Sequence, residues 1–204
     1  MTFSAEQRAA RMRRRLLAAG LALPFIDWRG ASAQSLRPTP VCGSDATTAA
    51  VTPPQTAGPY YSPDSPRRSS LVEPGDRGPR LLLEGRVLTT ACRPVPRALL
   101  DVWHCDARGD YDNTGFRHRG HLYADASGGY RLETIVPGLY PGRTRHIHIR
   151  VQAPGGTPLT TQLYFPGEAD NARDGIWQRV LEITLLRSTA GDVRQGRFDF
   201  VLEG

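Results

Sequence analysis

Lysine is absent from this 204-residue chain, so all 26 of its basic residues are arginine, against 20 acidic residues. The net charge of +6 is uneven. Residues 1–33 hold six arginines against Glu6 and Asp27, which is 6 − 2 = +4, and the remainder carries 6 − 4 = +2. Runs of basic residues interleaved with aromatic ones, which are typical of nucleic-acid surfaces, are also missing. The composition therefore gives no reason to expect a nucleic-acid partner.

The chain also lacks an apolar run long enough to span a bilayer. The run Leu16–Ile26 is too short, but it follows "RMRRR" and precedes Ala31-Ser32-Ala33, a small-residue cleavage pattern. This order predicts an export signal over residues 1–33, which would leave 204 − 33 = 171 residues periplasmic or secreted, with no membrane contact after cleavage. Arg13-Arg14 resembles the twin-arginine motif; a Sec signal and a basic amphipathic helix are the alternatives.

Cysteine is scarce. Cys42, Cys92 and Cys105 are three in number, so at most one internal disulfide can form. Cys92 is expected in a hairpin turn and Cys105 at the far end of the next strand, roughly 23 Å away. That separation is too long for a disulfide. We therefore expect Cys42 to pair with one of the other two cysteines.

Extended helical periodicity is missing too. Residues 34–78 are rich in Pro, Ser, Thr and Gly and predict a long irregular N-terminal arm. Residues 79–204 contain short alternating segments between Gly/Pro turns, which predicts an all-β fold, an antiparallel β-sandwich in one domain. Any helix should be short, near residues 171–178. The expected strands are 80–88, 98–105, 129–135, 145–151, 158–165, 180–186 and 197–203.

Two of the five histidines occupy alternate positions of one expected strand, "RHIHIRV". Because residues i and i+2 of a strand share a face, His146 and His148 should point one way, and Ile147, Ile149 and Val151 should point to the core. Two imidazoles placed in this way can bind one metal ion. They can also be ordinary polar residues on a solvated sheet face.

Two tyrosines are the candidate partners of these histidines. Tyr140 lies six residues before His146, and Tyr111 ends "DVWHCDARGDY". A tyrosine ligand must lose a proton whose usual pKa is about 10, and a hard, highly charged cation such as Fe(III) can drive that loss. Zinc prefers Cys, His and carboxylate ligands, and the Fe(II) triad needs a carboxylate. The residue types favour ferric iron if both tyrosines bind; the spacing alone leaves scattered structural tyrosines open.

Several longer blocks resemble the intradiol ring-cleavage dioxygenases, which include protocatechuate 3,4-dioxygenase subunits and exported intradiol dioxygenase-like proteins. The blocks are "CRPVPRALLDVWHCDARGDYDN", "ADASGGYRLETIVPGLYPGRTRHIHIRV" and "TTQLYF", and "TPPQTAGPYY" is similar to the family's N-terminal segment. The resemblance runs from about residue 52 to residue 200. It implies a β-sandwich enzyme that uses O2 to open a catechol-type ring between its two hydroxylated carbons. The product would be a muconate-type diacid, and Fe(III) would be the only cofactor.

The resemblance also implies the iron ligands. Tyr111 matches the tyrosinate that stays bound, and Tyr140 matches the tyrosinate that substrate displaces and that then takes a proton from the catechol. His146 and His148 match the two histidine ligands.

For the substrate pocket, the resemblance implies an arginine, a glutamine and one of two neighbouring tyrosines. Arg143 matches the arginine that faces the substrate ring, and Gln162, in "TQLYF", matches the glutamine beside it. Either Tyr60 or Tyr61 would line the pocket. The ring itself is left open among catechol, protocatechuate, hydroxyquinol and a lignin fragment.

The remaining histidines and two arginines receive separate predictions. His104 is expected to be a hydrogen-bonded structural residue, whereas His118 and His121, in "FRHRGHLY", are expected on an exposed loop. Arg117 and Arg119 could meet a ring carboxylate or face water.

Two other functions are left open by the sequence, and the sequence departs from the family pattern in one respect. A non-catalytic exported sandwich that binds aromatics or polysaccharide is one alternative, and a zinc-dependent hydrolase that uses the histidine pair is the other. The long helical segment of the dimerising catechol dioxygenases is missing before the sandwich. A homo-oligomer would therefore have to use sheet faces or the N-terminal arm.

Overall fold

The computed structural model describes Cys42, residues 48–186 and residues 193–204; the expected export signal, residues 1–33, lies outside these ranges. The strands are β1 (Arg80–Thr89), β2 (Leu99–Trp103), β3 (Arg119–Tyr123), β4 (Gly129–Ile135), β5 (His146–Gln152), β6 (Leu159–Tyr164), β7 (Thr184–Leu186), β8 (Val193–Arg197) and β9 (Phe200–Leu202). Two short 3-10 helices, η1 (Asn171–Arg173) and η2 (Arg179–Leu181), lie between β6 and β7. Within the described ranges, no helix has the length and apolar character to cross a membrane.

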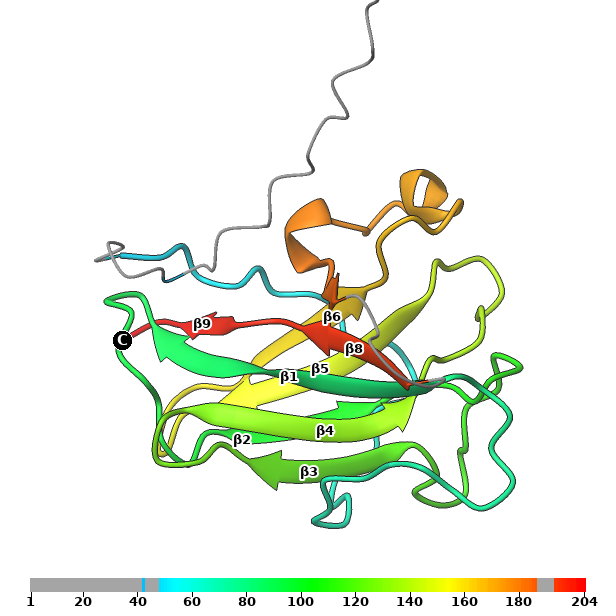
Figure 1. The fold of residues 1–204 in the computed structure, drawn as a ribbon, viewed down its shortest axis with the longest axis horizontal. Coiled ribbons are helices and arrows are strands. Elements are labelled where there is room, and N and C mark those ends of the chain that lie inside the picture. The colour runs from blue at the N-terminus through cyan, green and yellow to red at the C-terminus, as the bar shows by residue number, and fades with distance from the viewer. Residues whose placement is uncertain (1–41, 43–47, 187–192) are drawn as a thin grey trace, which may run out of the picture. The chain divides into compact units, whose positions relative to one another are not determined.

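The strands form two sheets that lie one over the other (Figure 1), which confirms the predicted sandwich. One sheet has the order β4-β1-β8-β7, with β9 also paired to β1, and the other has the order β3-β2-β5-β6. Most pairs are antiparallel, but β1 pairs in parallel with both β8 and β9. The five-stranded sheet is therefore mixed rather than wholly antiparallel.

The break between β8 and β9 has a local cause. The sequence predicted one strand over residues 197–203, but the backbone leaves β1 after Phe198, whose N–H donates to Glu84 O at 3.0 Å. The side chain of Asp199 then accepts the N–H of Arg86 at 2.9 Å. Gly85 permits this close approach, since a Cβ there would lie 1.7 Å from the carbonyl oxygen of Phe198.

The core fills the space between the two sheets, and it follows the alternation seen in the sequence. Leu81 and Leu83 of β1 and Leu132 of β4 face Ile147 and Ile149 of β5, and all five are fully buried. Burial of such aliphatic side chains is the main driving force for folding. The prediction that the isoleucines of "HIHIRV" face the core is confirmed.

Two of the local predictions were wrong. Residues 119–123, predicted as an exposed loop, form β3, which pairs antiparallel with β2. Residues 180–186 were predicted as one strand, but they begin in η2 and only residues 184–186 form β7. Polar side chains in "RHRGHLY" hid the strand alternation, because Arg119 is buried and His121 is half-buried beneath another part of the chain, while only Tyr123 of the outward residues is exposed. The short helix expected near residues 171–178 is the single 3-10 turn η1.

The part of the chain that covers this outward face is the arm, here residues 48–78. The arm contains no named strand, but its backbone bonds to both sheets. The N–H of Thr52 donates to Val201 O of β9 at 3.0 Å, and the N–H of Gln55 donates to Thr160 O of β6 at 2.8 Å. Further on, Arg67 forms an isolated bridge with His121 of β3. An irregular segment of this kind stays in place through such individual hydrogen bonds.

Cys42 and Cys92 form a disulfide, as expected for Cys42, and Cys105 is a buried free thiol. Cys92 lies in the connection between β1 and β2, which belong to different sheets. The predicted hairpin turn is present, since Cys92 N–H donates to Thr89 O at 2.9 Å and Leu88 forms an antiparallel bridge with Pro94. After this turn the chain crosses to the other layer of the sandwich and begins β2.

Candidate metal centre

His146 and His148 lie on the outer face of the four-stranded sheet, opposite the isoleucines of β5. Each is only 3% exposed, and their ring centroids are 4.8 Å apart. Trp103 of β2 is in register with His148, and the two rings stack at 5.0 Å with an interplanar angle of 4°. The two imidazoles are therefore buried and held in place rather than solvated.

The hydrogen bonding of His146 leaves one ring nitrogen available. Its Nδ1 lies 2.6 Å from Thr144 O, so Nδ1 carries the proton and donates it to this carbonyl. Nε2 is then unprotonated and lies 3.4 Å from Tyr111 Oη. Burial lowers the pKa of His146 to about 4, so the imidazole is neutral at neutral pH. A neutral imidazole whose other N–H is held by a carbonyl is the usual form of a metal-binding histidine.

His148 has a buried polar atom without a partner. Its Nδ1 makes no hydrogen bond within the described residues. Burial, and then the proximity of His146, lower the pKa of His148 well below its usual value. A buried polar atom without a partner is unfavourable by about 1–3 kcal/mol. The ring of His148 lies 4.8 Å from that of His146 and 6.2 Å from that of Tyr111, centroid to centroid, so an unpartnered nitrogen on this ring fits a metal-binding histidine.

Two loops bring tyrosines to this histidine pair. Tyr111 comes from the connection between β2 and β3, Tyr140 comes from the connection between β4 and β5, and their ring centroids are 5.8 Å apart. Burial raises the pKa of Tyr111 well above its usual value. The phenol is therefore neutral unless a cation is bound beside it. All four predicted ligands thus meet on one face of the sheet.

The structure separates the two neighbouring tyrosines of the arm. Tyr60 stacks on Tyr111, with ring centroids 4.4 Å apart, and its Oη lies 2.9 Å from Tyr140 Oη. Tyr61 instead donates to Asp101 Oδ2 at 3.2 Å and lies under the guanidinium of Arg150. Tyr60 therefore joins the predicted ligands, and Tyr61 packs beside them.

Arg143 is held in a fixed orientation by two neighbours. Its Nε lies 2.8 Å from Asp174 Oδ2 and its Nη2 donates to Gln162 Oε1 at 2.7 Å. Gln162 is in register with His148 and donates its own Nε2 to Thr56 O of the arm. Burial alone would raise the pKa of Asp174, but the hydrogen bonds from Arg143 and from the backbone outweigh it and lower that pKa.

A cavity of about 320 Å³ opens beside Arg143. It reaches from Tyr140 to the turn around η1, so the predicted arginine and the predicted displaceable tyrosine share its wall. The cavity is lined by Leu139, Tyr140, Pro141, Gly142, Arg143, Thr144, Asp170, Arg173 and Asp174. Tyr111, His146 and His148 do not line it, so the cavity lies beside the four predicted ligands and not among them.

Known proteins carry the same pattern. A family model described as Dioxygenase matches residues 56–204, and the similar curated proteins include catechol 1,2-dioxygenases and a protocatechuate 3,4-dioxygenase chain. The chain belongs to the intradiol ring-cleavage dioxygenase family.

Three of these family relatives show the range of similarity. The solved dioxygenase domain of a dioxygenase and carbohydrate-binding protein fusion from Streptomyces sp. SirexAA-E is 52% identical, with a TM-score of 0.73 over 76% of this chain and 99% of that one. The protocatechuate 3,4-dioxygenase beta chain of Burkholderia cepacia is 33% identical over 62% of this chain and 66% of its own length. A catechol 1,2-dioxygenase of a Pseudomonas species is 29% identical over 57% and 48%. The chain thus spans about half to two thirds of these curated intradiol dioxygenases.

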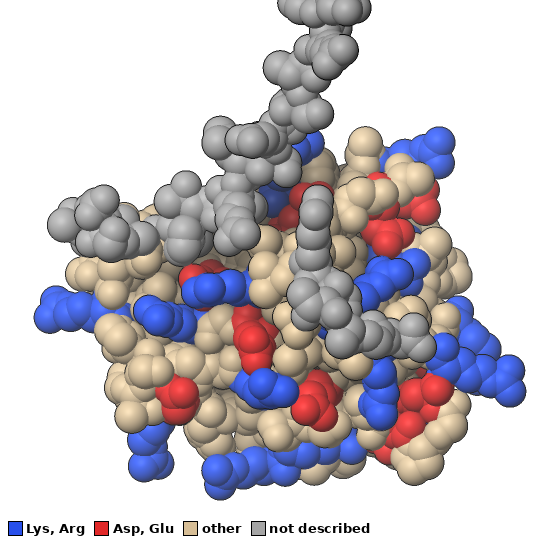
Figure 2. Space-filling model, in the orientation of Figure 1, with Lys and Arg blue, Asp and Glu red and all other residues tan. Residues whose placement is uncertain are grey.

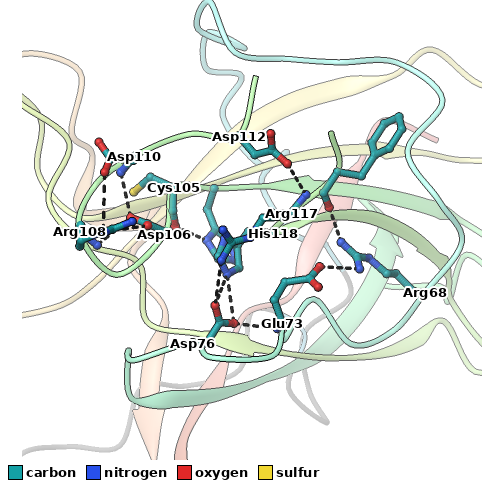
Figure 3. Close-up of polar contacts among 12 residues, drawn as sticks. Arg68, Glu73, Asp76, Cys105, Asp106, Arg108, Asp110, Asp112, Arg117 and His118 are labelled. Atoms are coloured by element: carbon teal, nitrogen blue, oxygen red, sulfur yellow. Dashed lines mark hydrogen bonds and ion pairs between the residues drawn. The ribbon is translucent and has the colours of Figure 1, made fainter. Parts of the chain in front are cut away.

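The loop that carries Tyr111 in this intradiol dioxygenase family member is ordered by its own acidic side chains. The carboxylate of Asp106 accepts the N–H groups of Arg108 and Asp110 at 2.8 and 3.0 Å. Asp112 accepts three backbone N–H groups, at 2.9 to 3.0 Å, including that of Arg117 (Figure 3). These hydrogen bonds lower the pKa of Asp112 to about 2. Local Asx turns of this type fix a loop without regular structure.

The three other histidines are all held by hydrogen bonds. His104 is buried, with Nδ1 2.7 Å from Cys105 O and Nε2 2.6 Å from Thr134 Oγ1, so its predicted structural role is confirmed. His118 and His121 are not on an exposed loop as predicted. His118 is buried with Nε2 3.0 Å from Asp76 Oδ1 (Figure 3), and His121 Nδ1 lies 2.7 Å from Ser65 O. The partners of both come from the arm, which the local sequence does not reveal.

Several residues of the site were missed from the sequence. Asp174, which holds Arg143, lies in a segment without periodicity and left no signal. Trp103 did leave a signal in the sequence. It alternates with Val102 in the strand that ends before Cys105, so its pairing with the strand of His146 and His148 could have been considered.

The two arginines that were left open in the sequence have different environments. Arg117 is exposed near Asp76, and Arg119 is 1% exposed.

Proposed function

We propose that this protein is an Fe(III)-dependent intradiol dioxygenase, which opens a catechol-type ring with O2 between the two hydroxylated carbons and forms a muconate-type diacid. Family membership supports the reaction class. The observation that carries the proposal is the meeting of two phenols and two neutral imidazoles, with Tyr111 Oη 3.4 Å from His146 Nε2.

The donor set fits ferric iron. Within the described residues, no group of three or more His, Cys, Asp or Glu side chains could hold a metal, so the donors beside the two histidines are the phenols of Tyr111 and Tyr140. Phenols in a buried site ionise only beside a strong positive charge. Ferric iron, when bound by these four residues, would supply that charge and the redox chemistry that lets a catechol react with O2.

Tyr140 and Tyr60 are placed to handle a substrate proton. As a phenolate, Tyr140 can accept a proton from a catechol hydroxyl at its Oη. The Oη of Tyr60, 2.9 Å away, can hold the resulting phenol by a hydrogen bond. Tyr140 is also less buried than the histidines and borders the cavity, so it is the predicted ligand that can leave.

Arg143 can stabilise negative charge on the reacting ring. Its guanidinium is permanently charged and is fixed by Asp174 and Gln162 before substrate arrives. A preorganised cation of this kind contributes most where charge develops during the reaction, in a site that excludes water. The ring of Tyr60 stacks on that of Tyr111, so it presents a flat aromatic surface beside the predicted ligands.

We further propose that the protein acts outside the cytoplasm, in the periplasm or as a secreted protein, on the basis of the N-terminal sequence. Its expected partners are a small catechol and O2, with no nucleic acid and no membrane once the signal has been removed. Any homo-oligomer would assemble through the sheet faces or the arm.

The test is to load the purified protein with Fe(III) and measure visible absorption and oxygen uptake with catechol, protocatechuate and hydroxyquinol. We expect a coloured protein, from charge transfer between phenolate and iron, and uptake with at least one substrate. Tyr111→Phe should shift or weaken the charge-transfer band, because only the phenolate of Tyr140 is left, and should lower uptake by at least about a hundredfold. Tyr130→Phe is the matched control, since Tyr130 is also buried but donates to Phe198 O in the other sheet.

Each contrary result has a clear meaning. An unchanged absorption band and unchanged uptake in Tyr111→Phe would contradict the assignment of Tyr111. A colourless protein that still binds iron would favour the non-catalytic binding module, and tight zinc with no iron would favour the hydrolase.

A further inference from the structure

Arg119 is an unusual residue in the neighbourhood of the site. It begins β3, lies in the cross-strand row with Trp103 and His148, and is 1% exposed. None of the ion pairs in the described part of the chain includes it. Removing a guanidinium from water without a carboxylate partner is costly. The groups that Arg119 contacts must therefore compensate for the loss of water around its guanidinium.

Those groups are two backbone carbonyls. Nε and Nη2 both donate to Asp112 O, at 3.1 and 2.8 Å, and Nη1 donates to Tyr60 O. The planar fork of arginine suits this arrangement, since its N–H donors are fixed relative to one another. Arg119 thus joins the arm, through Tyr60, to the loop that begins at Tyr111.

The two joined segments carry the stacked tyrosines. Tyr60 and Tyr111 lie 4.4 Å apart with an interplanar angle of 15°, and Tyr60 Oη reaches Tyr140 Oη. The arm and the loop are far apart in sequence, and neither Tyr60 nor Tyr111 lies in a strand or a helix that would fix its position. A tie between their backbones therefore sets the distance between the two rings.

We propose that Arg119 is a positioning residue, which clamps the backbone of Tyr60 to that of Asp112 so that Tyr60 stays stacked on Tyr111 and within reach of Tyr140. The clamp orients the phenol of Tyr111 toward His146. This consequence rests on the proposed function, because it matters only if Tyr111 holds a metal. The clamp itself does not depend on a metal.

The same contacts correct one expectation from the sequence. The sequence left open whether Arg119 meets a carboxylate on the substrate ring or faces water. Each of its three nitrogens already donates to the backbone and the side chain is buried, so it is placed neither to bind a substrate carboxylate nor to face water.

The first experiment is hydrogen exchange on the full chain with no iron added. In Arg119→Met, backbone amides in residues 56–62 and 111–117 should exchange about tenfold faster or more, because two charge-assisted ties are lost. Arg119→Lys keeps the charge but cannot bridge both carbonyls in the same way, so it should show the same direction of change. If Arg119→Met fails to fold, hydrogen exchange in Arg119→Lys tests the proposal instead.

Arg68→Met is the matched control. Arg68, which is drawn paired with Glu73 in Figure 3, also ties the arm to this loop. It donates to the carbonyls of Phe116 and Arg119 but makes no hydrogen bond to Tyr60 or Asp112. Its removal should speed exchange near residues 66–69 and 116–119 and leave residues 58–62 unchanged. Wild-type exchange at residues 58–62 in both Arg119 variants would overturn the proposal, as would an equal increase there in Arg68→Met.

The second readout is the absorption spectrum after Fe(III) is added. A displaced Tyr111 phenolate should shift or weaken the charge-transfer band in both Arg119 variants and not in Arg68→Met. An unchanged band in both Arg119 variants would overturn the claim that the clamp orients Tyr111. If the wild-type protein itself gave no coloured ferric complex, the proposed function would fail while the exchange result still tested the clamp.

Discussion

The outer faces of the two sheets make an instructive comparison. On the five-stranded sheet, which faces the viewer in Figure 2, arginine and acidic side chains intermingle at the surface. Arg131 there lies 2.9 Å from Glu84, which is half-buried, and 3.9 Å from Glu133, and both Arg131 and Glu133 are exposed. On the four-stranded sheet, polar residues at equivalent alternate positions are instead buried. They are Asp101, Trp103, Arg119, His146, His148 and Gln162.

The arm makes the difference between these faces. Ser65 donates to Asp101 Oδ1 at 2.7 Å, and Thr56 O accepts from Gln162, so the arm lies against the polar row. Burial raises the pKa of Asp101, even though hydrogen bonds from Ser65 and Tyr61 oppose the change. The same strand pattern thus yields surface charges on one sheet and a dry polar site on the other. Covering a polar face turns weak surface interactions into strong ones.

The largest expected difference between the faces is in acid stability. Burial lowers the pKa of His146 to about 4 and, with a smaller effect of His118, that of His104 to about 3. Because both values lie below the unfolded value of about 6.5, the unfolded chain binds more protons in this window. The stability contribution of each is complete above pH 6.5 and is lost as the pH falls toward 4 and then 3.

We therefore expect the iron-free protein to lose about 2 kcal/mol per histidine between pH 7 and pH 4.5, measured by urea unfolding at each pH. His104→Gln should show a smaller loss over the same range, because one of the three buried histidines with a lowered pKa, His104, His146 and His148, is gone. A free energy of unfolding that does not change between these pH values would contradict the burial-based account.

An intermediate effect is expected at Arg143, where the cavity meets the covered face. Lysine keeps the charge but cannot hold Asp174 and Gln162 together with one planar group. We expect Arg143→Lys to lower kcat/KM for oxygen uptake by about ten- to a hundredfold, with little change in Tm.

Arg145→Lys is the control for this substitution. Arg145 is similarly exposed but pairs with Glu168 at 2.8 Å and with a backbone carbonyl. It should change kcat/KM by less than about threefold. Equal losses in the two variants would show that arginine near β5 matters only for folding.

The smallest effect is expected on the exposed sheet. Glu84→Gln removes a carboxylate from a solvent-exposed pair with Arg131 and should change the free energy of unfolding by about 0.5 kcal/mol or less. Urea unfolding at low and high salt measures this. A loss above about 1 kcal/mol would mean that the two outer faces are less different than proposed.

The strand patterns and the residue types could be read from the sequence because they depend on local chemistry. Alternation placed Ile147 and Ile149 in the core, and β4 was predicted with its observed bounds, residues 129–135. Polar residues that are buried by distant segments broke this reasoning. β3 was missed because Arg119 and His121 look solvated unless the arm above them is known.

What the sequence determined by itself is therefore the sandwich, the shared face of His146 and His148 and, through the family motifs, the choice of the four side chains that we propose as metal ligands. Only the tertiary structure decided that Tyr60 rather than Tyr61 joins them, that Asp174 fixes Arg143, and that Arg119 ties the arm to the loop of Tyr111. The physical reason is that side-chain periodicity is set within one strand. The burial of a polar face depends on which distant segment packs over it.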